Sequence, residues 1–203
     1  MSSYVSIPVA TDGPLSTEAT RRQLNRRQAE TVEKLAQAAL EELREVGYDA
    51  LTVRSVAGRA RVAPATAYNY FSSKNHLVAE VFWRRLAARP RPEGAVGDAA
   101  DRVIAVLQDL VRFLGEEPEL AAAANPALLG PDPDVQHLRL RFGLEVQQRL
   151  ADALGTEADP QVLNTLLMLW AGGLLEGGMG YLSYEQVGEQ MSVAVRQIMG
   201  GAR

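Results

Sequence analysis

Apolar residues recur at three- and four-residue steps along most of the chain, which predicts α-helices with one buried face. The first such stripe covers residues 32–46 and stops at Gly47, a residue that suits the left-handed end of a helix. Alternating patterns typical of β-strands are not found at useful length. The pattern therefore predicts an all-α protein of about nine helices.

Three short helices are expected to follow the first one. Thr52 offers a side-chain cap for a helix over residues 53–60. A third begins near Pro64, which fits a first helical turn because that turn needs no N–H from it. Residues 72–74 interrupt the pattern and cap a fourth helix, whose apolar residues between 77 and 86 face inward.

Further helices are predicted over residues 103–114, 120–129, 135–154, 162–175 and 184–199. The fourth of these, 162–175, is apolar nearly all round. We therefore expect it to be buried on several sides.

Composition limits the class of protein. Of the 203 residues 47% are hydrophobic and 23% charged, as in globular proteins, and the absence of cysteine excludes disulfides and thiolate metal sites. No signal peptide is visible at the N-terminus, and the uncharged run over residues 160–175 is shorter than the about 20 residues of a membrane span. We expect a cytoplasmic protein without a membrane partner.

Charge is divided along the chain. Residues 21–91 hold 14 Lys and Arg against 7 Asp and Glu, a formal charge of +7, whereas residues 92–203 carry −9. A basic part joined to an acidic one favours nucleic-acid binding by the former. We divide the chain into a flexible N-terminal arm over 1–20, a DNA-binding domain over 21–88 and a helical domain over 89–203, joined at the Pro-rich segment 89–94.

Two short helices joined by a tight turn, the second polar and aromatic on its outer side, indicate a helix-turn-helix between Thr52 and Phe71. The residues that carry a more specific resemblance are Thr52-Val53-Arg54-Ser55-Val56-Ala57, Val62, Thr66, Tyr68-Asn69-Tyr70-Phe71, Ser73-Lys74 and Leu77. This pattern resembles the N-terminal domain of TetR-family transcriptional regulators. The match is gapless over residues 52–74 and covers about 32–86 in detail; beyond it only length and helical architecture agree.

Three positions depart from the pattern of the family. Relatives commonly have Gly where this chain has Arg61, Ser where it has Ala63, and a larger apolar residue where it has Ala67. If the φ of Arg61 is positive, this residue lowers the free energy of unfolding by on the order of 1 kcal/mol relative to glycine. Ala63 has no hydroxyl to cap the third helix or to bind phosphate.

The second helix of such a motif enters the major groove, and groups around it hold phosphates. Asn69 can pair with an adenine edge, and Ala65 and the Thr66 methyl can touch a thymine methyl. The resemblance implies phosphate contacts by Tyr68 and Lys74. The full set of expected DNA contacts is Thr52, Arg54, Arg61, Pro64, Ala65, Thr66, Tyr68, Asn69, Tyr70 and Lys74.

Structural roles compete with some of these assignments. Phe71 is expected in the core, Tyr70 could lie there too, and Thr52 caps a helix whether or not it also binds phosphate. Four arginines near the start of the first helix either solvate it or lie along a minor groove: Arg21, Arg22, Arg26 and Arg27.

The resemblance implies that the C-terminal helices dimerise and enclose a small-molecule pocket. Gly173 and Gly177 lie four residues apart on one helical face, so they permit close approach of another helix, either from a second copy or from the same chain. We expect the dimer interface to include Leu166, Gly173, Gly177 and Val195.

A largely apolar, elongated effector is favoured because aromatic residues make up only 6% of the chain. Taken singly, each residue of the expected pocket is more often plain core than a ligand contact. They are Phe82, Leu86, Leu107, Leu110, Val111, Leu114, Phe142, Val146, Leu167 and Trp170, with Asn125, Glu145, Gln148 and Asn164 as polar groups that could orient a ligand.

The resemblance implies regulation through the spacing of two recognition helices, which the effector changes. Catalysis is disfavoured: His76 and His137 lack metal-ligand spacing, Gly178-Met179-Gly180 is not a nucleotide loop, and no cofactor or metal is expected. The remaining alternative is an architectural DNA-binding protein without an effector.

Overall fold

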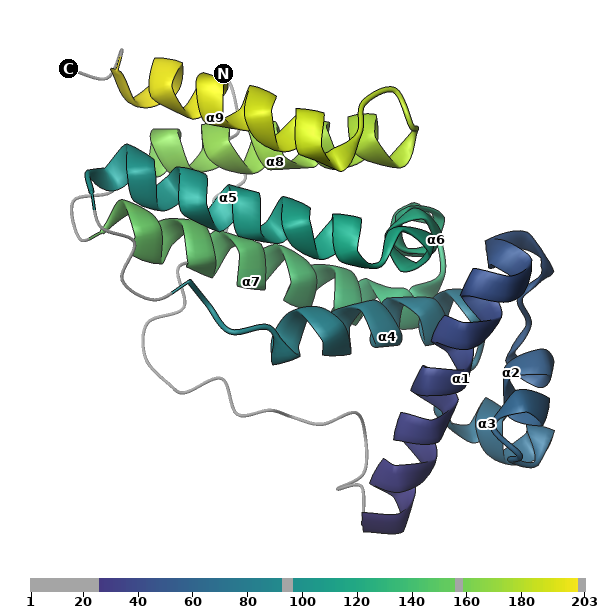
Figure 1. Ribbon diagram of the computed structural model, residues 1–203. Coiled ribbons are helices and arrows are strands. Elements are labelled where there is room, and N and C mark those ends of the chain that lie inside the picture. The colour runs from purple at the N-terminus through teal and green to yellow at the C-terminus, as the bar shows by residue number, and fades with distance from the viewer. Residues whose placement is uncertain (1–25, 93–96, 156–158, 201–203) are drawn as a thin grey trace, which may run out of the picture.

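The computed structural model describes residues 26–92, 97–155 and 159–200, and this part of the chain is helical without β-strands. The helices are α1 (Arg26–Ala50), α2 (Val53–Arg59), α3 (Pro64–Tyr70), α4 (Lys74–Ala88), α5 (Ala99–Glu116), α6 (Pro118–Leu129), the 3₁₀ turn η1 (Pro133–Val135), α7 (Gln136–Leu154), α8 (Pro160–Gly178) and α9 (Tyr184–Gly200) (Figure 1). The predicted all-α class is confirmed. The expected arm over residues 1–20 lies outside the described residues.

The four N-terminal helices follow the predicted bounds. Gly47 has a φ of 73° and breaks the regular geometry of α1, although the helix is continued to Ala50. Ser73 caps α4 by accepting a hydrogen bond from the backbone N–H of His76. The buried side chains of α4 are those expected, including Leu77, Phe82 and Leu86.

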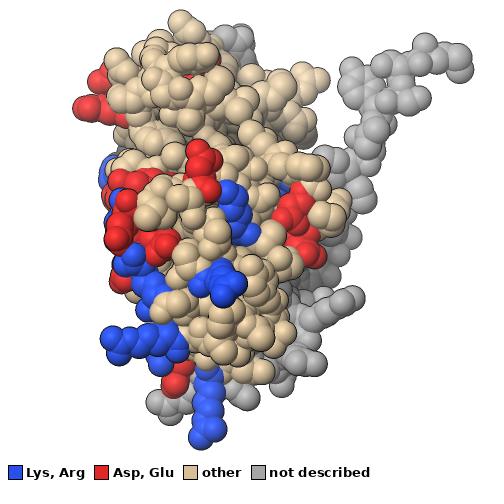
Figure 2. Space-filling model, turned by 90° about the vertical axis from the view of Figure 1, so that its right-hand side faces the viewer, with Lys and Arg blue, Asp and Glu red and all other residues tan. Residues whose placement is uncertain are grey.

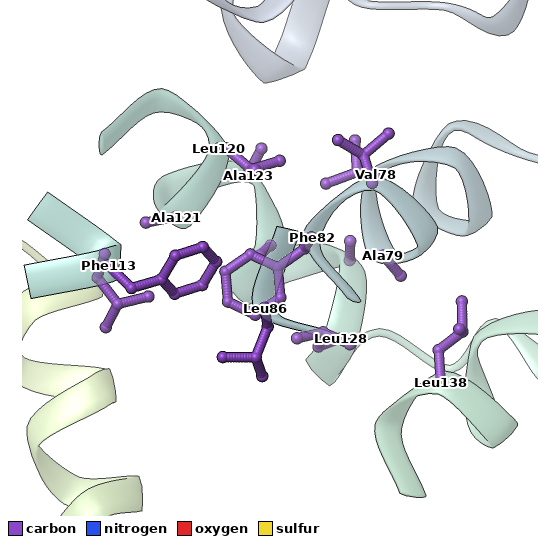
Figure 3. Close-up of a cluster of buried hydrophobic side chains, with 14 of the residues drawn as sticks. Val78, Ala79, Phe82, Leu86, Phe113, Leu120, Ala121, Ala123, Leu128 and Leu138 are labelled. Atoms are coloured by element: carbon purple, nitrogen blue, oxygen red, sulfur yellow. The ribbon is translucent and has the colours of Figure 1, made fainter. Parts of the chain in front are cut away.

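Helix α4 connects the two ends of the molecule. It packs against α1 on one side and against α6 and α7 on the other, so its side chains belong to both halves (Figure 1). Figure 3 shows Phe82 of α4 facing Phe113 of α5, with side chains of α6 around them. Helix α1 also packs against α6, so α4 and α6 both join α1–α3 to the C-terminal helices.

Hydrogen bonds also join the helix-turn-helix end to the other helices. Ser72 donates to Asp134 over 2.6 Å, and Ser73 donates to Asp132 over 2.5 Å. Both serines lie directly before α4, while the two aspartates lie around η1. These bonds hold the start of α4 against the turn that precedes α7.

In the C-terminal half α5 lies between α7 and α9, and α8 packs along α9 (Figure 1). The expectation that residues 162–175 are buried on several sides is wrong for the single chain: only Leu166 and Trp170 of α8 are buried. Met168 is 70% exposed and Leu175 is exposed as well. The reason is that α8 lies at the edge of the bundle, with neighbours on one side. Among the described residues, no helix is long and apolar enough to cross a membrane.

Candidate nucleic-acid interface

The start of α2 is fixed by a reciprocal pair of hydrogen bonds. The Thr52 hydroxyl accepts from the backbone N–H of Ser55 over 2.9 Å, and the Ser55 hydroxyl accepts from the backbone N–H of Thr52 over 3.2 Å. This capping box satisfies two N–H groups that a helix start otherwise leaves unpaired. The predicted cap role of Thr52 is confirmed.

Replacing Thr52 with Ala should lower the free energy of unfolding by about 1 kcal/mol, because the N–H of Ser55 loses its acceptor. Thr52→Ser retains a hydroxyl at this position and should stay near the wild-type value. Urea unfolding of the three proteins measures the difference. Equal loss in both variants would contradict the capping role.

The turn between α2 and α3 depends on Arg61. Its φ is 55°, so a non-glycine residue occupies the left-handed region at the position where relatives commonly have Gly. The backbone N–H of Arg61 donates to the Gly58 carbonyl over 3.1 Å, and that of Val62 donates to the Ala57 carbonyl over 2.9 Å. The turn therefore closes without glycine, and the Arg61 side chain is exposed beside α3.

Helix α3 rests on the core through one small residue. Ala67 is its only fully buried residue, so the helix lies close against its neighbours. Pro64, Ala65, Tyr68 and Asn69 are exposed, while Thr66 and Tyr70 are half-buried. Ala63 caps α3 without a side-chain hydrogen bond, as expected from its missing hydroxyl. The outer face thus carries Asn69 and Tyr68, the latter 49% exposed.

The segment that contains α2 and α3 has no carboxylate. From residue 50 to residue 79 the sequence contains Arg54, Arg59, Arg61 and Lys74 but neither Asp nor Glu. Arg54 and Arg61 are exposed, whereas Arg59 is held by ion pairs with Glu42 and Glu45 of α1. In Figure 2, Lys and Arg side chains protrude at the lower end, where α2 and α3 lie in Figure 1. The face around α3 can therefore approach a polyanion.

Lys74 has a further role that the sequence did not indicate. Its ammonium donates to the carbonyl of Tyr48 over 3.1 Å and to that of Asp49 over 3.4 Å, and lies 4.2 Å from the centre of the Tyr48 ring. Since an ammonium has three N–H groups, one is left for a phosphate. Lys74 thus ties the start of α4 to the end of α1. Phe71 is in the core, as expected, being 2% exposed.

Comparison with known proteins agrees with this geometry. Residues 35–81 match the family model described as bacterial regulatory proteins, tetR family. An uncharacterised HTH-type transcriptional regulator of Mycobacterium tuberculosis is 40% identical over 204 aligned residues, which cover 100% of this chain and 96% of that protein. The chain belongs to the TetR family of transcriptional regulators. The HTH-type transcriptional repressor KstR of Mycolicibacterium smegmatis is 26% identical, with 96% of each protein covered.

Solved structures show the same fold for this TetR-family chain. A TetR transcriptional regulator from Rhodococcus sp. RHA1 superposes with a TM-score of 0.71 at 23% identity, over 86% of this chain and 98% of the other. The likeness therefore extends well beyond the helix-turn-helix, to most of the C-terminal helices.

The C-terminal residues expected to line a pocket in this TetR-family protein pack against one another. The ring centroid of Phe82 lies 5.3 Å from that of Phe113 (Figure 3). It lies 5.5 Å from that of Phe142. Phe142 and Leu167 are half-buried. The other residues of the expected pocket are fully buried: Phe82, Leu86, Leu107, Leu110, Val111, Leu114, Val146 and Trp170. These residues form the core between α4, α5, α7 and α8.

Three of the four polar groups expected near this core point elsewhere. Glu145 forms ion pairs with Arg91 and Arg149, Gln148 donates to Asp152 over 2.7 Å, and Asn164 is exposed. Asn125 is half-buried on α6, against Gly178 of α8. The structure thus assigns Glu145 and Gln148 to surface networks.

The four residues expected at a dimer interface face their own chain. A Cβ atom on Gly173 would lie 2.8 Å from Val187 of α9, and one on Gly177 would lie 2.7 Å from the Tyr184 ring. The close approach that these glycines permit is therefore with α9 of the same chain. Both Leu166 and Val195 are fully buried within the chain. Their place at a dimer interface stays a prediction.

His76 and His137 lie together although they are distant in sequence. Their ring centroids are 6.1 Å apart, and burial lowers the pKa of His76. In the part of the chain that the structure describes, no three His, Asp or Glu residues are placed to hold a metal ion. The pair lies where α4 meets α7, beside the bond from Ser72 to Asp134.

Proposed function

We propose that the chain is a sequence-specific DNA-binding repressor that acts as a homodimer and is released from its operator by a small molecule. The observation that carries DNA reading is the outer face of α3, which is exposed in a segment without Asp or Glu. Relatives named as transcriptional repressors support the direction of regulation.

In the proposed complex α3 lies in the major groove. Asn69 and Ala65 face base edges together with Pro64 and the exposed part of Thr66, and the Asn69 amide pairs with adenine. Phosphates are bound around the groove by the Tyr68 hydroxyl and by exposed or partly exposed groups that flank α3: Thr52, Arg54, Arg61, Tyr70 and Lys74.

The proposed dimer uses an exposed apolar stripe on α8. Met168, Gly172, Leu175 and Met179 follow one another at steps of four, three and four residues, so they share one face of the helix. The three side chains are exposed, and nothing lies within 4 Å of a Cβ atom built on Gly172. Val193 of α9 is exposed too. Contiguous exposed apolar surface of this kind marks protein interfaces.

The proposed effector acts through α4. The core between α4, α5 and α7 is filled by side chains such as Phe82 and Leu86, so a ligand entering it must part α4 from these helices (Figure 3). Because α3 immediately precedes α4, such a movement changes the spacing of two recognition helices in a dimer. Ligand and operator must then weaken each other's binding by the same factor.

Binding of the purified protein to the DNA upstream of its own gene, compared with random duplex over a salt series, tests the proposal. Asn69→Ala should weaken specific binding about tenfold or more, because a bidentate base contact is lost, and leave binding to random duplex unchanged. Equal affinity of the wild type for both duplexes would favour an architectural DNA-binding protein instead.

A further inference from the structure

A hollow at the surface lies between the segment after α4 and the helices α5 and α7. Its volume is about 270 Å³, and its walls are Arg91, Pro92, Arg102, Val106, Arg149, Asp152 and Ala153. Three guanidinium groups thus face one carboxylate, beside apolar surface from the proline, valine and alanine. The lining differs from the filled core described above and has the composition of a site for an anion with an apolar body.

Arg102 is held in place by two backbone carbonyls. Its Nε donates to the Ala153 carbonyl over 2.9 Å and its Nη1 donates to the Gly97 carbonyl over 3.1 Å. No carboxylate lies within ion-pairing distance of Arg102 among the described residues. Two hydrogen bonds to carbonyls fix the guanidinium and leave its Nη2 available. A fixed guanidinium loses little freedom when it binds a carboxylate.

Arg149 is buried and incompletely paired. The residue is 3% exposed, its Nε donates to Glu145 over 2.8 Å, and its Nη1 has no hydrogen-bond partner. The nearest carboxylate oxygen of Asp109 is 3.8 Å from Nη1, beyond hydrogen-bonding distance. An unpaired N–H on a buried charge is costly, and a bound oxygen would remove that cost.

The third arginine of the hollow, Arg91, is partly exposed. Its side chain is 45% exposed and forms ion pairs with Glu145 over 3.0 Å and with Asp152 over 2.8 Å. Exposed pairs of this kind contribute little free energy, so Arg91 can exchange one of these carboxylates for another. If Arg91 leaves Glu145, that carboxylate keeps its 2.8 Å bond from Nε of Arg149.

We propose that this hollow binds a small organic carboxylate. One carboxylate oxygen accepts from Nη2 of Arg102 and the other accepts from Arg91, with the charge of Arg149 in the wall of the hollow. The apolar body of the ligand lies against Val106, Ala153 and Pro92.

The site is connected to α4. Nη2 of Arg149 donates to the carbonyls of Leu86 over 3.3 Å and Arg89 over 3.2 Å, at the C-terminal end of α4. A ligand that draws Arg149 toward the hollow weakens these two hydrogen bonds. The carboxylate is then the charged head of the effector, a conclusion that rests on the proposed function.

Calorimetric titration of the full chain without DNA tests the site. The probes are sodium hexanoate and sodium benzoate, with hexanamide and benzamide as uncharged controls. Both carboxylates should bind, and the amides should bind at least about tenfold more weakly because they lack the charge. Arg102→Gln should weaken hexanoate binding about tenfold or more.

The matched control is Arg139→Gln. Arg139 likewise donates to two carbonyls, those of Leu128 and Gly130, but does not line the hollow. Its replacement should leave hexanoate affinity unchanged. Thermal unfolding establishes that Arg102→Gln and Arg139→Gln are folded.

The site is overturned if the amides bind as well as the carboxylates, if Arg139→Gln weakens binding as much as Arg102→Gln, or if neither carboxylate binds. Addition of hexanoate to the protein–DNA complex then tests the link to α4 separately. Release of DNA supports the link, and binding of hexanoate without any change in DNA affinity contradicts it.

Discussion

Replacing Met168 with Glu should convert a dimer into monomers and reduce operator affinity by about 100-fold or more. Met168 is 70% exposed at the start of the apolar stripe on α8, so a symmetric interface built on this stripe buries it. The Glu carboxylate would lose its hydration in the interface without gaining a positively charged partner. Each monomer then binds one half-site, and the gain from linking two recognition helices is lost.

Sedimentation equilibrium measures the first effect, and DNA titration measures the second. Leu129→Glu is the matched control, since Leu129 is 67% exposed on α6 and lies outside the stripe. It should leave both values near wild type. A Met168→Glu protein that remains dimeric would place the interface elsewhere.

Replacing Phe82 with Ala should lower the free energy of unfolding by about 3–5 kcal/mol. Phe82 is 2% exposed, and its ring contacts Phe113 of α5 and Phe142 of α7, so truncation leaves a cavity where α4 meets the C-terminal helices. The loss includes the transfer of the removed atoms and the contacts around the cavity.

Chemical denaturation of wild type, Phe82→Ala and Leu140→Ala makes the comparison. Leu140 of α7 is exposed, so its truncation should change the free energy of unfolding by less than about 0.5 kcal/mol. A similar loss in both variants, or no loss in Phe82→Ala, would contradict the packed core between α4, α5 and α7.

The N-terminal half could be predicted closely because its signals are local. The hydroxyl of Thr52, the proline at the start of α3 and the hydroxyl of Ser73 each act within a few residues, and each is found in the predicted role. The positive φ of Arg61 follows from the same local pattern.

The C-terminal half was harder to predict because its faces depend on distant partners. Gly173 and Gly177 show that another helix approaches, but the sequence does not distinguish α9 of the same chain from a second copy. Similarly, the apolar composition of α8 predicts that the helix is buried. The sequence does not show that much of its apolar surface is exposed in a single chain.

Ion pairs and buried polar groups were missed for the same reason. Arg149 looks like a surface residue of an amphipathic helix, yet it is buried by contacts with the end of α4 and with Glu145. Asp132 and Asp134 lie in a Pro-rich turn with no local signal that they accept hydrogen bonds from the serines before α4.

Selection of bound duplexes from a random DNA pool by the purified protein tests the central claim most directly. A dimer that reads bases through α3 should enrich two inverted half-sites whose centres lie about 34–36 Å apart, one helical turn of DNA. Asn69→Ala should lose the preference at one position of each half-site. A pool that stays random after repeated rounds, although the protein retains DNA, would contradict sequence-specific recognition.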